Sequence, residues 1–220
     1  MPLQSEAMRD DGINMGFVAV IFCVVAGLLV ANHALAPQET QVDVAALPQI
    51  ERADLILSPR QGPVDPQRVE LGYEAHATLK HTYDIAGTVV TARPHLAGGM
   101  SEIAPLDLGI AWGPMAQREV LAASRYTAGH RYLKWRVPVE MVPMEEQSIN
   151  ISNTHLIPAD NVVRDAMMEM KPGQSVRLTG FLVDVYQDGM LPWRSSVTRD
   201  DGFPAGCEIM LVTQAEITRG

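Results

Sequence analysis

An apolar run near the N-terminus constrains this chain more than any other feature of its sequence. No Asp, Glu, Lys or Arg occurs from Gly12 to Ala36, and the stretch from Met15 to Ala31 is uninterrupted apolar sequence. A membrane-spanning helix needs about 20 apolar residues, whereas the apolar core of a secretory signal peptide has only about 7–15. The run therefore predicts a helix that enters a membrane.

Two readings of this helix remain open, a retained signal anchor and a cleaved signal peptide. The "ALA" at residues 34–36 has the A-x-A form that signal peptidase recognises. Against cleavage, Pro37 follows the cut directly, and the leader "MPLQSEAMRDDG" is acidic where a signal peptide is basic. The retained anchor is the favoured interpretation, with cleavage as its alternative.

The charges that flank the run predict its orientation. Arg9 and the α-amino group precede the run, and no further positive charge follows it until Arg52. By the positive-inside rule, the N-terminus stays in the cytoplasm and the rest of the chain is exported. In a bacterium this gives a single-pass inner-membrane protein with its C-terminal domain in the periplasm.

The chain is expected to divide into four parts. After the anchor comes a stretch rich in Pro and Gln without a clear hydrophobic period, which is typical of a tether. The parts are a cytoplasmic N-terminus (1–12), a transmembrane signal anchor (13–36), a tether (37–67) and an exported β-rich domain (68–220).

The exported part has the composition and pattern of a mainly β domain. With 15 Pro and 17 Gly it favours many short elements over a helical bundle. Expected strands cover 85–92, 106–113, 131–139, 174–186, 190–198 and 207–217, and expected helices cover 114–124 and 158–173. Asp160 is expected to cap the second helix, and Gly180 to permit a bulge. The predicted class is α+β, mainly β: a small β-barrel or curled antiparallel sheet, with an OB-like design as one option, and one or two short helices.

Charge and motifs exclude several functions. The net charge of −9 repels phosphate backbones, so nucleic-acid binding is not expected. The sequence has no C-x-x-C, no H-E-x-x-H, no phosphate loop and no haem motif, so no cofactor is expected.

Five short stretches carry a resemblance. They are "GIAWGPMA" (109–116), "SNTHLIPAD" (152–160), "VRLTGFLVDV" (176–185), "WRSSVTRDD" (193–201) and "AGCEIMLV" (205–212). Together they resemble a group of uncharacterised, membrane-anchored or exported proteobacterial proteins. The resemblance covers about residues 105 to 213. It implies a bacterial source and an exported domain, and it transfers no catalytic residue.

One group of polar residues raises the possibility of catalysis. His155 lies in a polar run before a helix, and it could serve as a base for Ser196, with Arg199 and Glu208 nearby in an envelope hydrolase. The favoured interpretation is structural. His155 then bonds to backbone and pins its loop, and an Arg–carboxylate network holds residues 199–206. The lone thiol of Cys207 is expected to be buried, because Ile209 and Leu211 follow it.

The twelve methionines raise a third function, copper binding. Thioethers are soft ligands for Cu(I). The favoured interpretation is that Met fills a core with only 5% aromatic residues. The candidate ligands are Met141, Met144, Met167 and Met170.

The function favoured by the sequence is binding. A tethered domain meets a membrane-bound partner at raised effective concentration, so the chain is expected to be a non-catalytic accessory module of an envelope or membrane protein complex. Expected partners are the lipid bilayer and a membrane or envelope protein. In the anchor, small residues allow close packing against another helix. In the exported domain, two Trp side chains are expected to contact a partner. The partner-binding candidates are Gly16, Ala19, Gly27, Trp112 and Trp193.

Overall fold

The computed structural model describes residues 40–52, 57–97, 99–198 and 207–218. The expected anchor, with Gly16, Ala19 and Gly27, lies outside these ranges, as does Arg199. Within them, no helix combines the length and apolar character needed to cross a bilayer.

Five strands form a closed circuit of hydrogen-bonded pairs. In order of pairing they are β3 (Ala75–Pro94), β4 (Leu106–Ala111), β7 (Ile151–Pro158), β9 (Cys207–Thr218) and β8 (Ser175–Gln187), and β8 pairs again with β3. Four of the five pairings are antiparallel, and β7 and β9 are parallel. The expected mainly β, α+β class is confirmed. The expectation of a wholly antiparallel sheet is wrong, because β7 and β9 are parallel. The chain forms α4 (Asn161–Met168) and β8 between these two strands.

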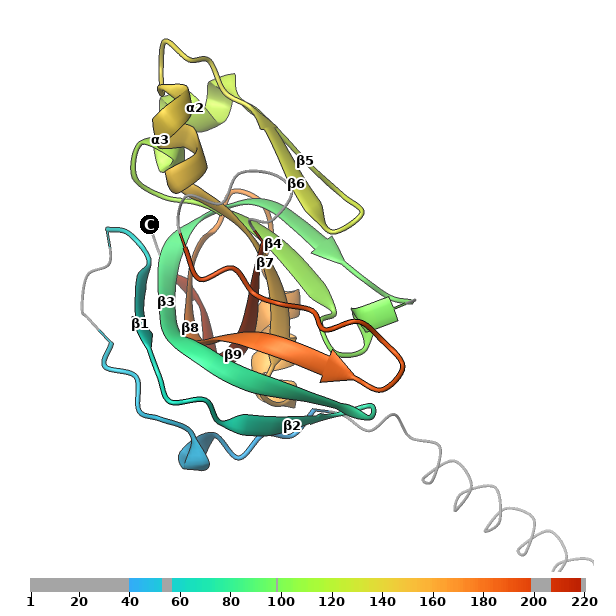
Figure 1. The fold of residues 1–220 in the computed structure, drawn as a ribbon. Coiled ribbons are helices and arrows are strands. Elements are labelled where there is room, and N and C mark those ends of the chain that lie inside the picture. Colours follow the sequence, from blue (N-terminus) through green and yellow to red (C-terminus); the bar gives the residue numbers. More distant parts are fainter. Residues whose placement is uncertain (1–39, 53–56, 98, 199–206, 219–220) are drawn as a thin grey trace, which may run out of the picture. The chain divides into compact units, whose positions relative to one another are not determined.

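The circuit closes through β3, which is long and strongly curved (Figure 1). Its first part pairs with β8 over residues 75–88, and its last part pairs with β4 over residues 88–94. The register shifts between Leu79 and His81, and again between Val89 and Thr91. Such bulges bend a strand and increase its twist. The bent β3 can therefore pair with β8 along its first part and with β4 along its last part.

Much of the expected tether packs against the sheet. β1 (Arg60–Pro63) and β2 (Arg68–Gly72) pair with the outer edge of β3, and a 3₁₀ turn, η1 (Val44–Ala46), precedes them. Val42 and Leu47 are buried in a core cluster. The hydroxyl of Thr40 donates a 2.8 Å hydrogen bond to the Leu71 carbonyl. The packed part of the chain therefore begins by Thr40.

A helix packs against a core cluster to which all five strands contribute. α4 (Asn161–Met168) begins where Asp160 Oδ1 accepts a 2.8 Å hydrogen bond from the Val163 amide, as the sequence predicts. Val163 and Met167 on its buried face pack with Leu108 and Leu156 of the strands. The amphipathic pattern of 158–173 thus serves to bury an apolar stripe.

An insertion between β4 and β7 forms a small separate layer (Figure 1). It consists of η3 (Gly113–Ala116), α2 (Arg118–Ala123), the hairpin β5 (Arg125–Gly129) and β6 (Tyr132–Arg136), and α3 (Met144–Ile149). Gly109 of β4 lets this layer approach, because a Cβ there would crowd the Leu133 side chain. The expected helix at 114–124 is present in two short pieces. α3 was not foreseen.

Two further expectations need correction. Residues 190–198 were predicted to form a strand, but only one bridge, between Val185 and Trp193, is formed. Pro192 interrupts the pairing because it has no amide hydrogen to donate. Trp112 was predicted to contact a partner, but it is 3% exposed and packs in the core, so a partner cannot reach it.

We predict that Gly180→Ala destabilises the fold. Gly180 lies at the β8 bulge, and a Cβ there would overlap the backbone carbonyl of Leu211. Overpacking against backbone is expected to lower the free energy of unfolding by about 2–3 kcal/mol, measured by urea denaturation. Gly62→Ala is the matched control, because its Cβ would lie 3.6 Å from Thr82 Oγ1, an ordinary contact. Equal stability of the two variants would contradict the close approach of β8 to β9.

Candidate functional site

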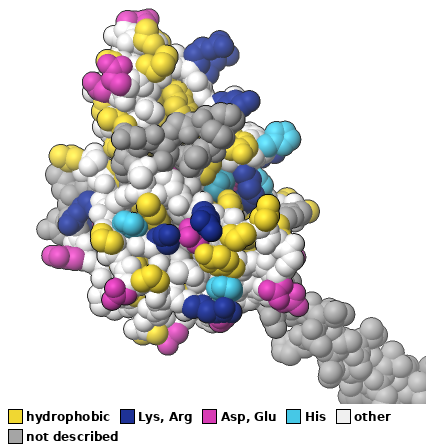
Figure 2. All heavy atoms as spheres, in the orientation of Figure 1, with side chains coloured by type: hydrophobic (Ala, Val, Ile, Leu, Met, Phe, Trp, Pro, Cys, Tyr) yellow, Lys and Arg dark blue, Asp and Glu magenta, His cyan; other side chains and the backbone are white. Residues whose placement is uncertain are grey.

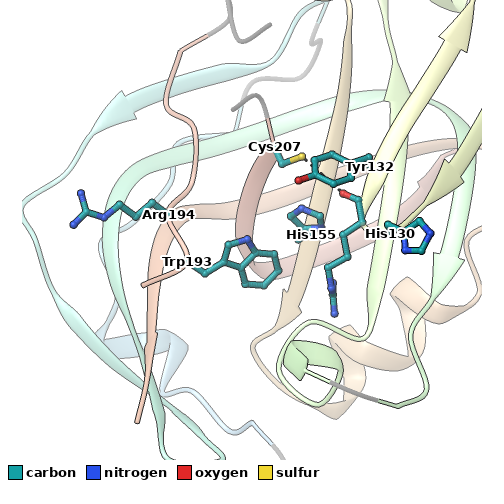
Figure 3. Close-up of a pocket in the computed structure, with 7 residues that line it drawn as sticks. His130, Tyr132, His155, Trp193, Arg194 and Cys207 are labelled. Carbon is teal, nitrogen blue, oxygen red and sulfur yellow. Dashed lines mark hydrogen bonds between the residues drawn. The ribbon is translucent and has the colours of Figure 1, made fainter. Parts of the chain in front are cut away.

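A pocket of about 410 Å³ lies where the β5–β6 turn, β7 and the β8–β9 connection meet. Figure 3 shows the side chains that line it. Two are aromatic, four are basic or imidazole side chains, and one is a thiol. They are His130, Arg131, Tyr132, His155, Trp193, Arg194 and Cys207.

A buried carboxylate organises the floor of this pocket. Asp107 on β4 is 2% exposed, and the register sets it opposite His155 on β7. Its neighbours Leu106 and Leu108 point into the core, so strand alternation turns Asp107 to the other face. His155 Nδ1 lies 2.8 Å from Asp107 Oδ1, and both side chains are almost completely buried.

Two more donors reach Asp107 from connecting segments. His95, directly after β3, places Nε2 2.7 Å from Oδ2, and its own amide donates to the Pro105 carbonyl. Arg131 in the β5–β6 turn donates from Nη1 to Oδ1 at 2.9 Å. A single carboxylate therefore ties together β4, β7, the end of β3 and the tip of the inserted hairpin.

These partners set the protonation of Asp107. Burial raises the pKa of this carboxyl group, but the hydrogen bond and charge of His155, the charge of Arg131 and the hydrogen bond of His95 outweigh burial. The net result is a pKa below the ordinary value. Asp107 is therefore ionised at neutral pH, and a buried ionised group needs such partners.

Trp193 forms a wall of the pocket. Its ring lies 4.7 Å from the His155 ring, centroid to centroid, and the Arg131 guanidinium lies 5.3 Å from its centroid. The backbone of Trp193 is fixed by two hydrogen bonds with Val185, at 2.7 and 2.9 Å. The indole therefore contacts both the His155 imidazole and the Arg131 guanidinium, and the guanidinium lies within cation–π distance of its ring.

The contact with Asp107 determines what His155 can do. A carboxylate only accepts hydrogen bonds, so the proton of a neutral His155 ring resides on Nδ1. Nε2 is then left with a lone pair, able to accept a hydrogen bond or a proton. No His, Cys, Asp and Glu side chains form a metal-binding group of three in the described ranges. A cation at this site would bind the Asp107 carboxylate. The positively charged Arg131 guanidinium already lies beside that carboxylate and would repel the cation.

Of the predicted catalytic group, only His155 lines the pocket. The expectation that Cys207 is buried is wrong, because its side chain is partly exposed and lines the pocket as well. Ser196 does not, since its hydroxyl bonds to the Thr198 carbonyl and its amide to the Cys207 carbonyl. Glu208 is 5% exposed and alternates with Cys207 along β9, so it points to the opposite face of the strand. The expected bond of His155 to backbone is replaced by its bond to Asp107.

The four candidate copper ligands lie in different environments. Met167 on α4 and Met170 just after it are buried in the core, at 0% and 2% exposure. Met141 and Met144 are exposed, on the inserted layer near α3. The structure therefore does not assemble these thioethers into a site, and the two buried ones fill the core, as the favoured interpretation held.

Sequence reasoning missed Asp107, His95 and Arg131. Asp107 carried a usable signal, because an acidic residue between two leucines of a predicted strand is rarely buried without a partner. His95 and Arg131 carried none, since only the three-dimensional pairing of strands brings residues 95, 107, 131 and 155 together.

Comparisons with known proteins identify no relative of this chain. No protein-family model matches the chain, and searches of curated proteins and of solved structures give no significant match. The resemblance to exported proteobacterial proteins therefore stays a prediction.

We predict that Asp107→Asn destabilises the protein by about 3 kcal/mol at pH 7, because it leaves buried donors without their anionic partner. The pKa of Asp107 is lowered in the folded state, so its stabilising effect is complete above the unfolded carboxyl pKa. The effect is lost as the pH falls through the lower, folded-state pKa. Urea unfolding at pH 7 and at pH 3 should therefore show a smaller difference between wild type and variant at pH 3.

The matched control is Asp65→Asn, since Asp65 is exposed. It should change the stability by less than about 0.5 kcal/mol at either pH. A difference between wild type and Asp107→Asn that stays constant with pH would show that the carboxylate charge is not what stabilises this site.

Proposed function

We propose that this chain is a membrane-anchored module of the bacterial envelope whose exported domain binds a partner through the pocket beside Asp107. In this proposal residues 13–36 anchor the chain in the inner membrane, and the domain acts in the periplasm. Its role is that of a non-catalytic accessory component of an envelope or membrane protein complex.

The order of the strands is the observation that carries the proposal. We infer that β3, β4, β7, β8 and β9 form a small OB-like barrel, with α4 between its third and fourth strands. The closed circuit of pairings and the parallel β7–β9 pair support this inference. OB-like barrels bind ligands on the face of their second and third strands, between the connections that follow the first and the fourth.

The pocket occupies the corresponding position in this chain. Asp107 and His155 lie on the second and third strands of the circuit, β4 and β7. His95 lies in the connection after β3, and Trp193 in the connection after β8. Fold likeness by itself carries no function. Here, however, the expected binding face also carries a buried carboxylate, Asp107, that is paired with the two imidazoles of His95 and His155.

The contacts of the site favour binding over turnover. Catalysis by His155 needs a nucleophile within hydrogen-bond reach of Nε2. Ser196, the predicted nucleophile, makes its hydrogen bonds elsewhere, and Glu208 faces the core side of β9. Asp107 is shared among three donors, which suits a fixed scaffold for a ligand.

A hydrolase remains the second candidate because of one observation. The Asp107–His155 pair has the carboxylate–imidazole geometry that holds a general base in its active tautomer. In that case a water or an incoming substrate would meet Nε2 in the pocket. The two functions separate experimentally, since His155→Gln removes a base but keeps a side chain that can hydrogen-bond.

We predict that partner retention depends on Trp193. The tagged full-length protein is purified in mild detergent from its own membranes, and retained proteins and envelope components are identified by mass spectrometry. Wild type should retain a stoichiometric component, and Trp193→Ala should lose at least about 90% of it, because the pocket wall is removed. The intact mass reports in the same experiment whether residues 1–36 are kept.

Trp135→Ala is the control, since Trp135 is also partly exposed but lies on β6 outside the pocket lining. Equal retention by wild type and both variants would mean that the pocket is not the binding surface. Wild-type retention by His155→Gln, together with loss by Trp193→Ala, would fit binding. No retained component, with turnover of an envelope substrate that His155→Gln abolishes, would favour the hydrolase.

A further inference from the structure

The lining of the pocket carries a charge opposite to that of the whole chain. Among the described residues it contains two Arg and two His and no Asp or Glu, whereas the chain has a net charge of −9. Acidic side chains lie mostly toward the margin of the face shown in Figure 2. A cleft lined by one sign of charge concentrates ions of the opposite sign.

Asp107 offsets part of this positive charge but does not itself line the pocket. Its carboxylate lies beneath the lining, 2% exposed, and its oxygens already accept from His95, His155 and Arg131. It acts from behind as the counter-ion that keeps the guanidinium and the imidazole in place. An incoming anion would meet the Arg131 guanidinium on its side away from Asp107.

Arg131 is positioned before any ligand arrives. Its guanidinium donates to Asp107 Oδ1 at 2.9 Å and to the Ala104 carbonyl at 3.2 Å, and it packs on the Trp193 ring. The side chain is still 23% exposed, and a guanidinium has five N–H donors, so donors remain for a ligand. A group fixed in this way loses little further entropy on binding.

The turn that presents Arg131 has an uncommon composition. His130 and Arg131 have φ values of 51° and 61°, in the left-handed region where Gly and Asn are favoured. The β2–β3 turn has the same geometry at Tyr73 and Glu74, so the geometry belongs to the hairpin type. What distinguishes the β5–β6 turn is that both of its side chains line the pocket and both are basic or imidazole groups.

From these observations we infer that the pocket binds a small oxyanion, a carboxylate or phosphate group, between Arg131 and His130 and against the ring of Trp193. The inference rests on the proposed binding function and names its ligand class. A volume of about 410 Å³ is in the range of small-molecule sites. Carboxylate and phosphate share the geometry that a guanidinium recognises with two parallel hydrogen bonds.

The test uses the full-length protein in non-ionic detergent, titrated separately with inorganic phosphate and with succinate. Binding is followed by calorimetry and by tryptophan fluorescence. At least one of the two anions should bind saturably at a 1:1 ratio and change the fluorescence. Arg131→Gln should weaken that binding at least tenfold, and Trp193→Phe should remove most of the fluorescence change. The anion that binds identifies the ligand as a phosphate or a carboxylate.

Arg136→Gln is the matched control. Arg136 is exposed at the end of β6 away from the β5–β6 turn, and it does not line the pocket. Its loss should change the affinity less than twofold. If Arg131→Gln does not fold, His130→Gln takes its place, since His130 is exposed at the turn and should weaken binding about threefold.

Absence of saturable binding by both anions would overturn the inference, and so would equal effects of Arg131→Gln and Arg136→Gln. Neither result touches the proposed function, which depends on partner retention through Trp193. Conversely, anion binding with unchanged retention by Trp193→Ala would support the inference and contradict the proposed function.

Discussion

The candidate site depends on the ionised carboxylate of Asp107, which is buried and bonded to three donors. Each donor comes from a different segment, His95 after β3, Arg131 in the inserted hairpin and His155 on β7. A buried charge is costly unless it is paired, so the fold must bring all three segments to β4. The same contacts orient His155 and Arg131 toward the pocket and place both beside Trp193. Stability and site geometry therefore come from one set of interactions.

The strand circuit makes this convergence possible. Because β3 bends at its bulges and pairs with both β4 and β8, residues that are far apart in sequence share one outer face. Alternation along β4 and β7 then separates the core side, with Leu108 and Leu156, from the site side, with Asp107 and His155. The insertion after β4 adds the hairpin whose tip supplies Arg131. Gly109 allows that layer to lie close to the sheet.

Local signals predicted much of the fold and little of the site. The helix at 158–173, its Asp160 cap, the Gly180 bulge and the last two long strands follow from periodicity, capping and turn chemistry, which act over a few residues. The parallel pairing of β7 with β9 and the packing of residues 40–52 depend on contacts far apart in sequence, which no local pattern encodes. His155 and Trp193 were identified because they stand in unusual polar runs. Arg131 and His95 were not, because their roles exist only once Asp107 lies between them.

The most direct test of this account is the protonation of the histidine rings. Long-range ¹H–¹⁵N spectra of the ¹⁵N-histidine-labelled full-length protein distinguish the two nitrogens of each of its six imidazoles. At neutral pH we predict a proton on Nδ1 of His155 and on Nε2 of His95, both shifted by the hydrogen bond to Asp107 and both altered in Asp107→Asn. A His155 ring protonated only at Nε2, or rings unaffected by Asp107→Asn, would contradict the account that Asp107 organises the site.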